Sequence, residues 1–173
     1  SRDVKYGKPK VNARGMKSVA INNSNTGMGL QLAFPLLLTW GANTRNNDDG
    51  RTTYDFSLQF PRQEYANDRA TQCLEVLRAL ESKLLSDAIA NSKEWFNKSK
   101  LTRDQLDVLY NKMLYVPTDQ STGEPREGAA PTLRVKLDCW DGQFNQDIFD
   151  TAGKTLYPDA ESNTTPLDYI TKG

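Results

Sequence analysis

Alternation of hydrophobic and polar positions predicts β-strands along much of the chain. In Tyr54–Phe60 and in Thr132–Leu137, every second residue is large and hydrophobic while the residues between are polar or charged. A strand places successive side chains on opposite faces, so both segments are expected to be half-buried strands. Shorter patterns predict further strands at Lys17–Ile21, Leu30–Trp40 and Phe144–Asp150.

A helical pattern separates the third of these strands from the fourth. Hydrophobic residues recur there at spacings of three and four, at Ala70, Cys73, Leu74, Leu77, Leu80, Leu84, Ala88 and Trp95. This spacing predicts an amphipathic helix of about 30 residues after Pro61. Thr102 and Gln105 have the capping-box spacing and predict the start of a second, shorter helix.

The turns between these elements suggest a fold class. Asn43–Arg51 is a long polar turn, and Asp141-Gly142 favours a tight hairpin because such a pair readily adopts positive φ. The order of elements predicts a mainly β fold with α (α+β), an OB-fold-like antiparallel barrel with a long helix inserted between the third and fourth strands. An α+β sandwich would give the same order. We expect one OB-like domain over residues 1–173, with a basic N-terminal arm at residues 1–16.

Composition excludes several classes of chemistry. The 173 residues contain no histidine, which removes the commonest general base and metal ligand and every Ser-His or Cys-His nucleophile arrangement. We therefore expect no enzyme and no cofactor. The two cysteines, Cys73 and Cys139, give no disulfide framework, and the apolar runs are too short to span a membrane. With no signal region recognisable at the start of the sequence, we expect an intracellular protein.

Charge is balanced overall but uneven along the chain. Lysine plus arginine and aspartate plus glutamate number 22 each, yet residues 1–17 hold six basic residues against one aspartate. Residues 138–173 hold seven acidic residues against two lysines. The basic head is either a phosphate-contacting arm or a solvated terminus. The balanced total argues against nonspecific duplex binding over the whole surface.

Four aspartates cluster around the predicted C-terminal hairpin, at Asp138, Asp141, Asp147 and Asp150. Such carboxylates can hold Mg²⁺ in nucleases. Aspartates at turns and strand ends are more often solvated turn formers, so we expect no metal site.

Aromatic and basic residues gather on the predicted strands, a mixture that allows bases to stack while phosphates are neutralised. Phe56 and Phe60 are expected in the core, whereas Trp40 and Trp140 are close to a glycine at a strand end, which favours exposure. The candidate phosphate contacts are Lys17, Arg45, Arg51, Arg134 and Lys136, and the candidate stacking rings are Trp40, Tyr54, Trp140 and Phe144.

The segment Pro131–Lys154 (PTLRVKLDCWDGQFNQDIFDTAGK) resembles the single-stranded DNA-binding proteins of large algal DNA viruses. Those proteins are themselves similar to the replication single-strand binder of short-tailed bacteriophages. Lys17–Trp40 shares the likeness, and the order of elements agrees over most of the chain. The resemblance implies an OB-fold, a shallow basic and aromatic groove, and replication or recombination proteins as partners. A viral protein of this kind would act in the host nucleus or at a cytoplasmic replication site.

Proteins of that family carry a further strand and an acidic C-terminal tail. We therefore expect either that this chain lacks them or that the sequence is incomplete at its C-terminus. A homodimer is one of the assemblies that the resemblance leaves open.

Two functions follow as hypotheses. The first is sequence-independent binding of single-stranded DNA in DNA replication, recombination or repair. The alternative is a non-enzymatic structural or protein-interaction component of a viral particle or replication complex, in which the long helix or the basic arm docks onto a partner. A metal-dependent nuclease that uses the four aspartates is a third class, which we do not expect.

Overall fold

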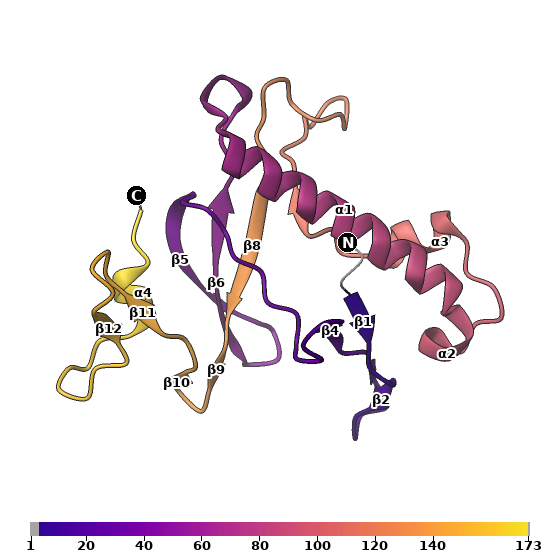
Figure 1. Ribbon diagram of the computed structural model, residues 1–173, viewed down its shortest axis with the longest axis horizontal. Helices are drawn as coiled ribbons and strands as arrows, with labels where there is room; N and C mark the ends of the chain where they lie inside the picture. The colour runs from indigo at the N-terminus through magenta and orange to yellow at the C-terminus, as the bar shows by residue number, and fades with distance from the viewer. Residues whose placement is uncertain (1–3, 173) are drawn as a thin grey trace. The chain divides into compact units, whose positions relative to one another are not determined.

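The computed structural model describes residues 4–172 (Figure 1). These residues form two compact units. Unit 1 combines residues 4–35 with 68–112, and unit 2 combines residues 36–67 with 113–172. Two compact units can belong to one domain, so the single domain expected over residues 1–173 stays a prediction.

Unit 2 is built on a four-stranded antiparallel sheet of order β5-β6-β8-β7 (Figure 1). Its strands are β5 (Leu38–Asn46), β6 (Thr52–Gln59), β7 (Leu114–Tyr115) and β8 (Thr132–Leu137). β5 and β6 form a hairpin around the polar turn that follows Asn46. β8 pairs along β6 although α1, α2, α3 and β7 separate the two strands in sequence.

The register of β6 and β8 gives this sheet two different faces. Phe56 lies opposite Val135, and Asp55 lies opposite Lys136. Because opposite residues share a face, Phe56 and Val135 belong to an apolar face while Asp55 and Lys136 belong to a polar one. The predicted alternation is thus confirmed. Phe60 is buried as expected, whereas Phe56 is only half-buried.

The rest of unit 2 is made of short elements. These are the 3₁₀ helix η1 (Gln63–Tyr65), β9 (Cys139–Trp140), β10 (Gln143–Phe144), β11 (Ile148–Phe149), β12 (Thr155–Tyr157) and α4 (Pro166–Tyr169). The tight hairpin is confirmed, because β9 pairs with β10 around Asp141 at φ 50° and Gly142 at φ 76°. The single returning strand expected at Phe144–Asp150 instead divides into β10 and β11.

The fold class is α+β with antiparallel sheets, as predicted. The described residues do not form the closed barrel that was expected. They form one open four-stranded sheet and four two-stranded sheets. One reason lies in the strand expected at Leu30–Trp40, which begins only at Leu38. Pro35 has no N–H to donate to a neighbouring strand, so residues before it do not extend β5. On its other edge, β5 pairs with no further strand of the described residues: Trp40 forms an isolated bridge to Lys172, and the Ala42 N–H donates to the Ile170 carbonyl at 2.9 Å.

Unit 1 joins two small antiparallel sheets to the helices. Its elements are β1 (Val4–Tyr6), β2 (Lys10–Val11), β3 (Lys17–Ser18), β4 (Ile21–Asn23), α1 (Asp68–Ala90), α2 (Ser92–Phe96) and α3 (Arg103–Leu109). The basic arm predicted at residues 1–16 therefore contains β1 and β2. Its first three residues lie outside the described residues. The predicted capping box of α3 is confirmed at Thr102 and Gln105.

The prediction of a single helix of about 30 residues is wrong in one respect. The structure has two helices there, α1 and α2, separated at Asn91. The Asn91 side chain donates through Nδ2 to the Asp87 carbonyl at 2.7 Å. Such a local side-chain bond competes with the backbone ladder of a helix. The backbone of Asn91 accordingly leaves helical geometry, at φ −102° and ψ 19°.

The core of unit 1 lies between its helices. Leu85, Ala88, Leu101 and Leu106 are buried together, and Ile89, Trp95 and Tyr110 pack against them. Tyr6 from β1 is attached to α1 by a hydrogen bond from its hydroxyl to Asp87 Oδ2 at 2.5 Å. Its ring also meets the Trp95 ring edge-on, at 4.8 Å between centroids.

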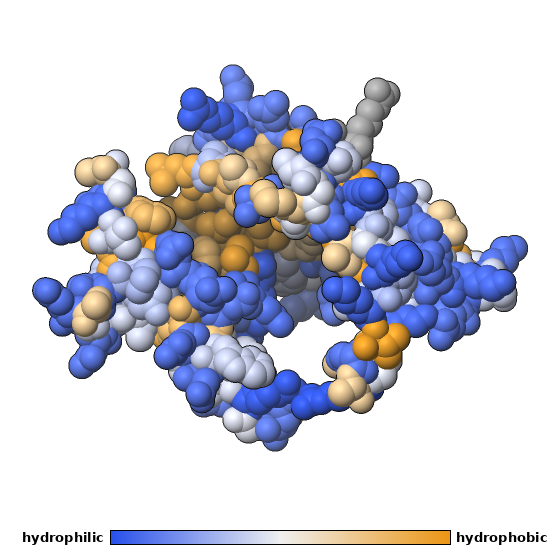
Figure 2. All heavy atoms as spheres, turned by 60° about the horizontal axis from the view of Figure 1, so that its bottom comes forward, coloured by the Kyte–Doolittle hydropathy of each residue, from blue (hydrophilic) through white to orange (hydrophobic). Residues whose placement is uncertain are grey.

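Hydrophilic residues cover most of the face drawn in Figure 2, with hydrophobic residues in smaller patches among them. Within residues 4–172, no helix is both long enough and apolar enough to cross a membrane.

Candidate nucleic-acid interface

One face of the unit 2 sheet concentrates cations, and we name it the cationic face. It consists of Asn43 and Arg45 from β5, Asp55 and Ser57 from β6, and Arg134 and Lys136 from β8. Asn43, Asp55 and Lys136 form one row across the three strands, and Ser57 lies opposite Arg134 in the next row. Three cations and one carboxylate therefore share this face.

Asp55 lies at the centre of the cationic face and is only 1% exposed. Its Oδ2 accepts a hydrogen bond from Arg45 Nε at 2.9 Å and another from Arg134 Nη2. Its Oδ1 accepts a longer bond from Asn43 Nδ2, at 3.4 Å. A buried carboxylate is costly unless it is paired and hydrogen-bonded, and these three side chains supply both requirements.

The charge state of Asp55 follows from its surroundings. Burial alone would raise the pKa of this carboxyl, but hydrogen bonds and charge from Arg134 and Arg45 outweigh burial and hold the pKa below its ordinary value. Asp55 is therefore ionised at neutral pH. It neutralises only one of the two guanidinium charges, so the cationic face keeps an excess of positive charge.

The two arginines stay accessible although both bond to a buried group. The Arg45 side chain is 54% exposed and the Arg134 side chain is 50% exposed. A guanidinium carries several N–H donors in a planar fork, and the bond to Asp55 uses one from each residue. The remaining donors can reach an anion from solution.

Exposed aromatic rings flank one end of the cationic face. The row beyond Ser57 and Arg134 runs across the sheet through Leu38, Gln59, Thr132 and Tyr115. Tyr115 is therefore on the same face as the cations, and it is 63% exposed. Trp40 on β5 is 58% exposed, and Lys172 Nζ lies 4.9 Å from the centroid of its ring.

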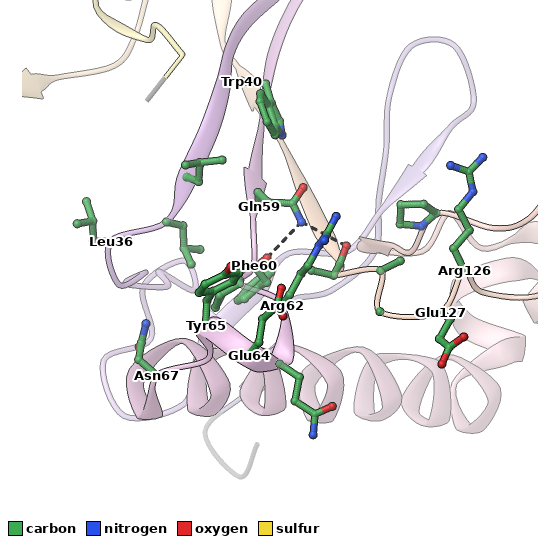
Figure 3. A pocket seen from close by; sticks show the side chains of 18 residues that line it. Leu36, Trp40, Gln59, Phe60, Arg62, Glu64, Tyr65, Asn67, Arg126 and Glu127 are labelled. Atoms are coloured by element: carbon green, nitrogen blue, oxygen red, sulfur yellow. Dashed lines mark hydrogen bonds between the residues drawn. The ribbon is translucent and has the colours of Figure 1, made fainter.

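A groove of about 1100 Å³ opens at this end of the sheet and is lined entirely by unit 2 (Figure 3). Trp40, Gln59, Tyr65 and Arg126 are among the residues that line it. In the view of Figure 3, Gln59 lies between Trp40 and Tyr65, and the groove is open to solvent around these side chains. Gln59 Nε2 is held by the carbonyls of Phe60 and Ala130, at 3.2 and 3.3 Å. The groove thus combines rings with a fixed polar side chain.

Sequence reasoning missed Tyr115 and the groove. β7 is only two residues long, and so short a strand has no alternation that could reveal which side chain faces the cations. The groove combines β5, β6 and η1, which are consecutive in the chain, with the loop at residues 126–130, which comes about 60 residues later.

Two predicted stacking rings are not on the cationic face. Tyr54 lies directly opposite Leu137, which places it on the apolar face. Phe144 packs against Tyr54 with 4.9 Å between ring centroids and 60° between ring planes, and both rings are half-buried. Trp140 is largely exposed in the β9–β10 hairpin, as expected for a stacking ring.

Two predicted cations have partners of their own. Arg51, in the turn between β5 and β6, forms an ion pair with Asp49 two residues earlier. Lys17 belongs to unit 1, where its Nζ donates to the Glu94 carbonyl at 2.9 Å and to Asn97 Oδ1 at 2.6 Å. Of the five predicted phosphate contacts, the sheet brings together Arg45, Arg134 and Lys136.

Asp150, one of the four aspartates near the C-terminal hairpins, behaves as a turn former. Asp150 Oδ1 accepts the backbone N–H groups of Ala152 and Lys154, at 2.9 and 2.8 Å. Across residues 4–172, no three side chains of histidine, cysteine, aspartate or glutamate are grouped so that they could hold a metal ion.

Comparison of the chain with known proteins finds no matching family model, no matching curated protein and no matching solved structure. The likeness of Pro131–Lys154 to viral single-stranded DNA-binding proteins therefore stays a prediction. What the residues of the cationic face can do has to be argued from their own chemistry.

Proposed function

We propose that unit 2 binds single-stranded DNA without sequence preference, in DNA replication, recombination or repair. One observation supports this most strongly: Arg45, Arg134 and Lys136 share a sheet face with the exposed ring of Tyr115, and the exposed ring of Trp40 lines the groove at the end of that face. Cations beside exposed rings are the combination by which proteins bind unpaired strands, because phosphates are neutralised while bases stack.

The dimensions suit a short stretch of strand. From Thr53, opposite Arg45, to Gln59 at the groove, β6 covers about 20 Å, because a strand rises by about 3.4 Å per residue. Phosphates would follow the cations along this distance, and bases would stack on Tyr115 and Trp40. Rings stack fully only on bases that are free of a duplex, which favours single strands over double strands.

Rough magnitudes agree with useful binding. Stacking contributes about 1–3 kcal/mol per base, so two rings supply a substantial share of the affinity. Neutralisation of two to three phosphates of a single strand by the three cations predicts a slope of about −1.4 to −2 for log K against log salt concentration. Trp140, which is largely exposed in the β9–β10 hairpin of the same unit, remains a candidate for a further contact with a longer strand.

The test is a titration of the protein with oligo-dT, followed by tryptophan fluorescence at low and at high salt. Arg134→Ala should weaken binding by about tenfold, because a charge-assisted contact is worth about 1.5 kcal/mol or more. Arg103→Ala is the matched control, since it removes an equally exposed arginine from α3 in unit 1. Equal affinities for the two variants would count against the cationic face as the binding surface.

The second candidate function is a structural or protein-interaction component of a viral particle or replication complex. The observation in its favour is a group of exposed apolar side chains that line the groove, at Leu36, Leu38, Trp40 and Tyr65. Contiguous exposed apolar patches often mark a protein contact. Self-association, or binding to a replication protein, with no fluorescence response to oligo-dT would favour this candidate. Both candidates imply an intracellular setting.

A further inference from the structure

We infer that Arg45 and Arg134 form one defined site for a single phosphate group, with Asp55 as the residue that positions both guanidinium groups. This inference rests on the proposed binding of single-stranded DNA and specifies which atoms hold the backbone. It distinguishes a built anion site from a diffuse positive surface.

The geometry brings the two guanidiniums to the same point from opposite sides. Arg45 reaches across from β5 and Arg134 from β8, and both donate to Oδ2 of Asp55 on the strand between them. Two nitrogens bonded to one oxygen lie no more than about 6 Å apart, because each hydrogen bond is about 3 Å long. That separation is short enough for the oxygens of one phosphate to reach both groups.

Charge favours an anion at this position. Two guanidiniums so close together repel each other, and Asp55 compensates only one of them. Lys136, directly opposite Asp55 on β8, adds a third positive charge to the same face of the sheet. Arginine binds phosphate through its planar fork, often with two parallel bonds, so free N–H groups on two arginines suit one phosphate.

Asp55 also prepares the site before any ligand arrives. Ordering a long side chain at an interface costs free energy, and here the bonds to a buried carboxylate already hold both arginines. The strands that carry them are paired along the sheet. A phosphate would therefore meet donors whose positions are already set.

Two other interpretations of Asp55 give different expectations. If only the net charge of the face matters, removing an acidic group should strengthen DNA binding. If Asp55 serves stability alone, its replacement should change unfolding but leave the affinity of the folded protein unchanged. The positioning role predicts weaker binding although the surface becomes more positive.

The decisive variant is Asp55→Asn, titrated with fluorescein-labelled oligo-dT at low salt. We expect affinity to fall by about fivefold to tenfold, about 1.0–1.4 kcal/mol, which is within the cost of ordering one long side chain on binding. Asp147→Asn is the matched control, because it removes an equal charge from an exposed position in unit 2 and should leave affinity unchanged or slightly higher. Affinity of Asp55→Asn equal to or above that of the unaltered protein would overturn the inference.

A second set of variants decides the matter if Asp55→Asn fails to fold. Arg45→Lys and Arg134→Lys keep the charge but lose the planar fork, so each should weaken binding by about fivefold. Because both arginines contact one phosphate, most of the affinity is already lost with the first substitution. The affinity of the double variant should therefore be close to that of whichever single variant binds less tightly. Arg103→Lys in α3 is the control. Full affinity in both lysine variants, or simply additive losses, would contradict a shared site.

The two levels of the proposal can be separated by the unaltered protein. If it binds oligo-dT while the aspartate and lysine variants behave like their controls, the defined site is wrong and DNA binding stands. If the unaltered protein does not bind oligo-dT at low salt, both are wrong.

Discussion

Arg134 donates a hydrogen bond across the sheet from β8 to the carboxylate of Asp55, which is almost wholly buried on β6. Arg45 donates to the same oxygen, so Asp55→Ala leaves two neighbouring guanidiniums without their shared anion. Removing one partner of a buried ion pair lowers the free energy of unfolding by about 3–5 kcal/mol. Both arginines are half exposed, so solvent compensates for part of the lost interaction, and we expect a loss of about 2–3 kcal/mol. Urea denaturation should show that loss, whereas Asp147→Ala, at an exposed position, should change stability by less than about 0.5 kcal/mol.

The same carboxylate predicts how stability responds to acid. The pKa of Asp55 lies below its ordinary value of 3.8 in the folded protein, so its contribution to stability is fully present above that value. The contribution is lost as pH falls further, through the lowered pKa of the folded state. Unfolding free energies measured from pH 7 to pH 3 should therefore decline at the acid end. Asp55→Asn should show a smaller decline, and an identical pH profile would contradict this account.

Tryptophan fluorescence should separate the rings by position. Trp40 lines the groove, whereas Trp95 packs against Tyr6 in unit 1. Trp40→Ala should weaken oligo-dT binding by about tenfold, since stacking is worth about 1–3 kcal/mol per base. Trp95→Phe should leave both the affinity and the quenching by DNA largely intact. Loss of quenching in Trp95→Phe but not in Trp40→Ala would place the binding surface elsewhere.

Unit 1 allows a stability prediction that is independent of DNA. Leu106 is buried in the core formed by Leu85, Ala88 and Leu101, whereas Val108 on the same helix is 86% exposed. Leu106→Ala should destabilise the protein by about 2–5 kcal/mol through a lost contact and a new cavity. Val108→Ala should cost less than about 0.5 kcal/mol. Similar chemical or thermal stability of the two variants would show that α3 does not complete this core.

Much of the secondary structure could be predicted from local patterns. The alternation in Tyr54–Phe60 and Thr132–Leu137, the capping box at Thr102 and the Asp141-Gly142 turn each depend on a few adjacent residues. Such signals need no knowledge of the rest of the fold. The prediction of a strand at Leu30–Trp40 was wrong, because β5 begins only at Leu38. Pro35 has no N–H to donate to a neighbouring strand, and this outweighs the hydrophobic alternation of the residues before it.

The candidate site was predictable only in part. Arg134 and Lys136 are identified by alternation on β8, but their partner Asp55 comes from a strand about 80 residues earlier in the chain. Tyr54 was assigned to stacking because it is an aromatic residue on a strand, yet the register to Leu137 places it on the apolar face. Pairing between distant strands determines which side chains meet, and no local pattern encodes it.

The most direct test of the proposed function compares two triple variants in one binding experiment. Arg45→Ala/Arg134→Ala/Lys136→Ala removes the three charges of the cationic face, and Lys98→Ala/Lys100→Ala/Arg103→Ala removes three exposed charges from unit 1. Anisotropy of labelled oligo-dT at low salt should show a loss of about 100-fold or more for the first variant, because all three cations that contact backbone phosphates disappear. The second should bind within about threefold of the unaltered protein, since charges outside the contact surface act only through a screened field. Undiminished binding by the first variant would contradict the account.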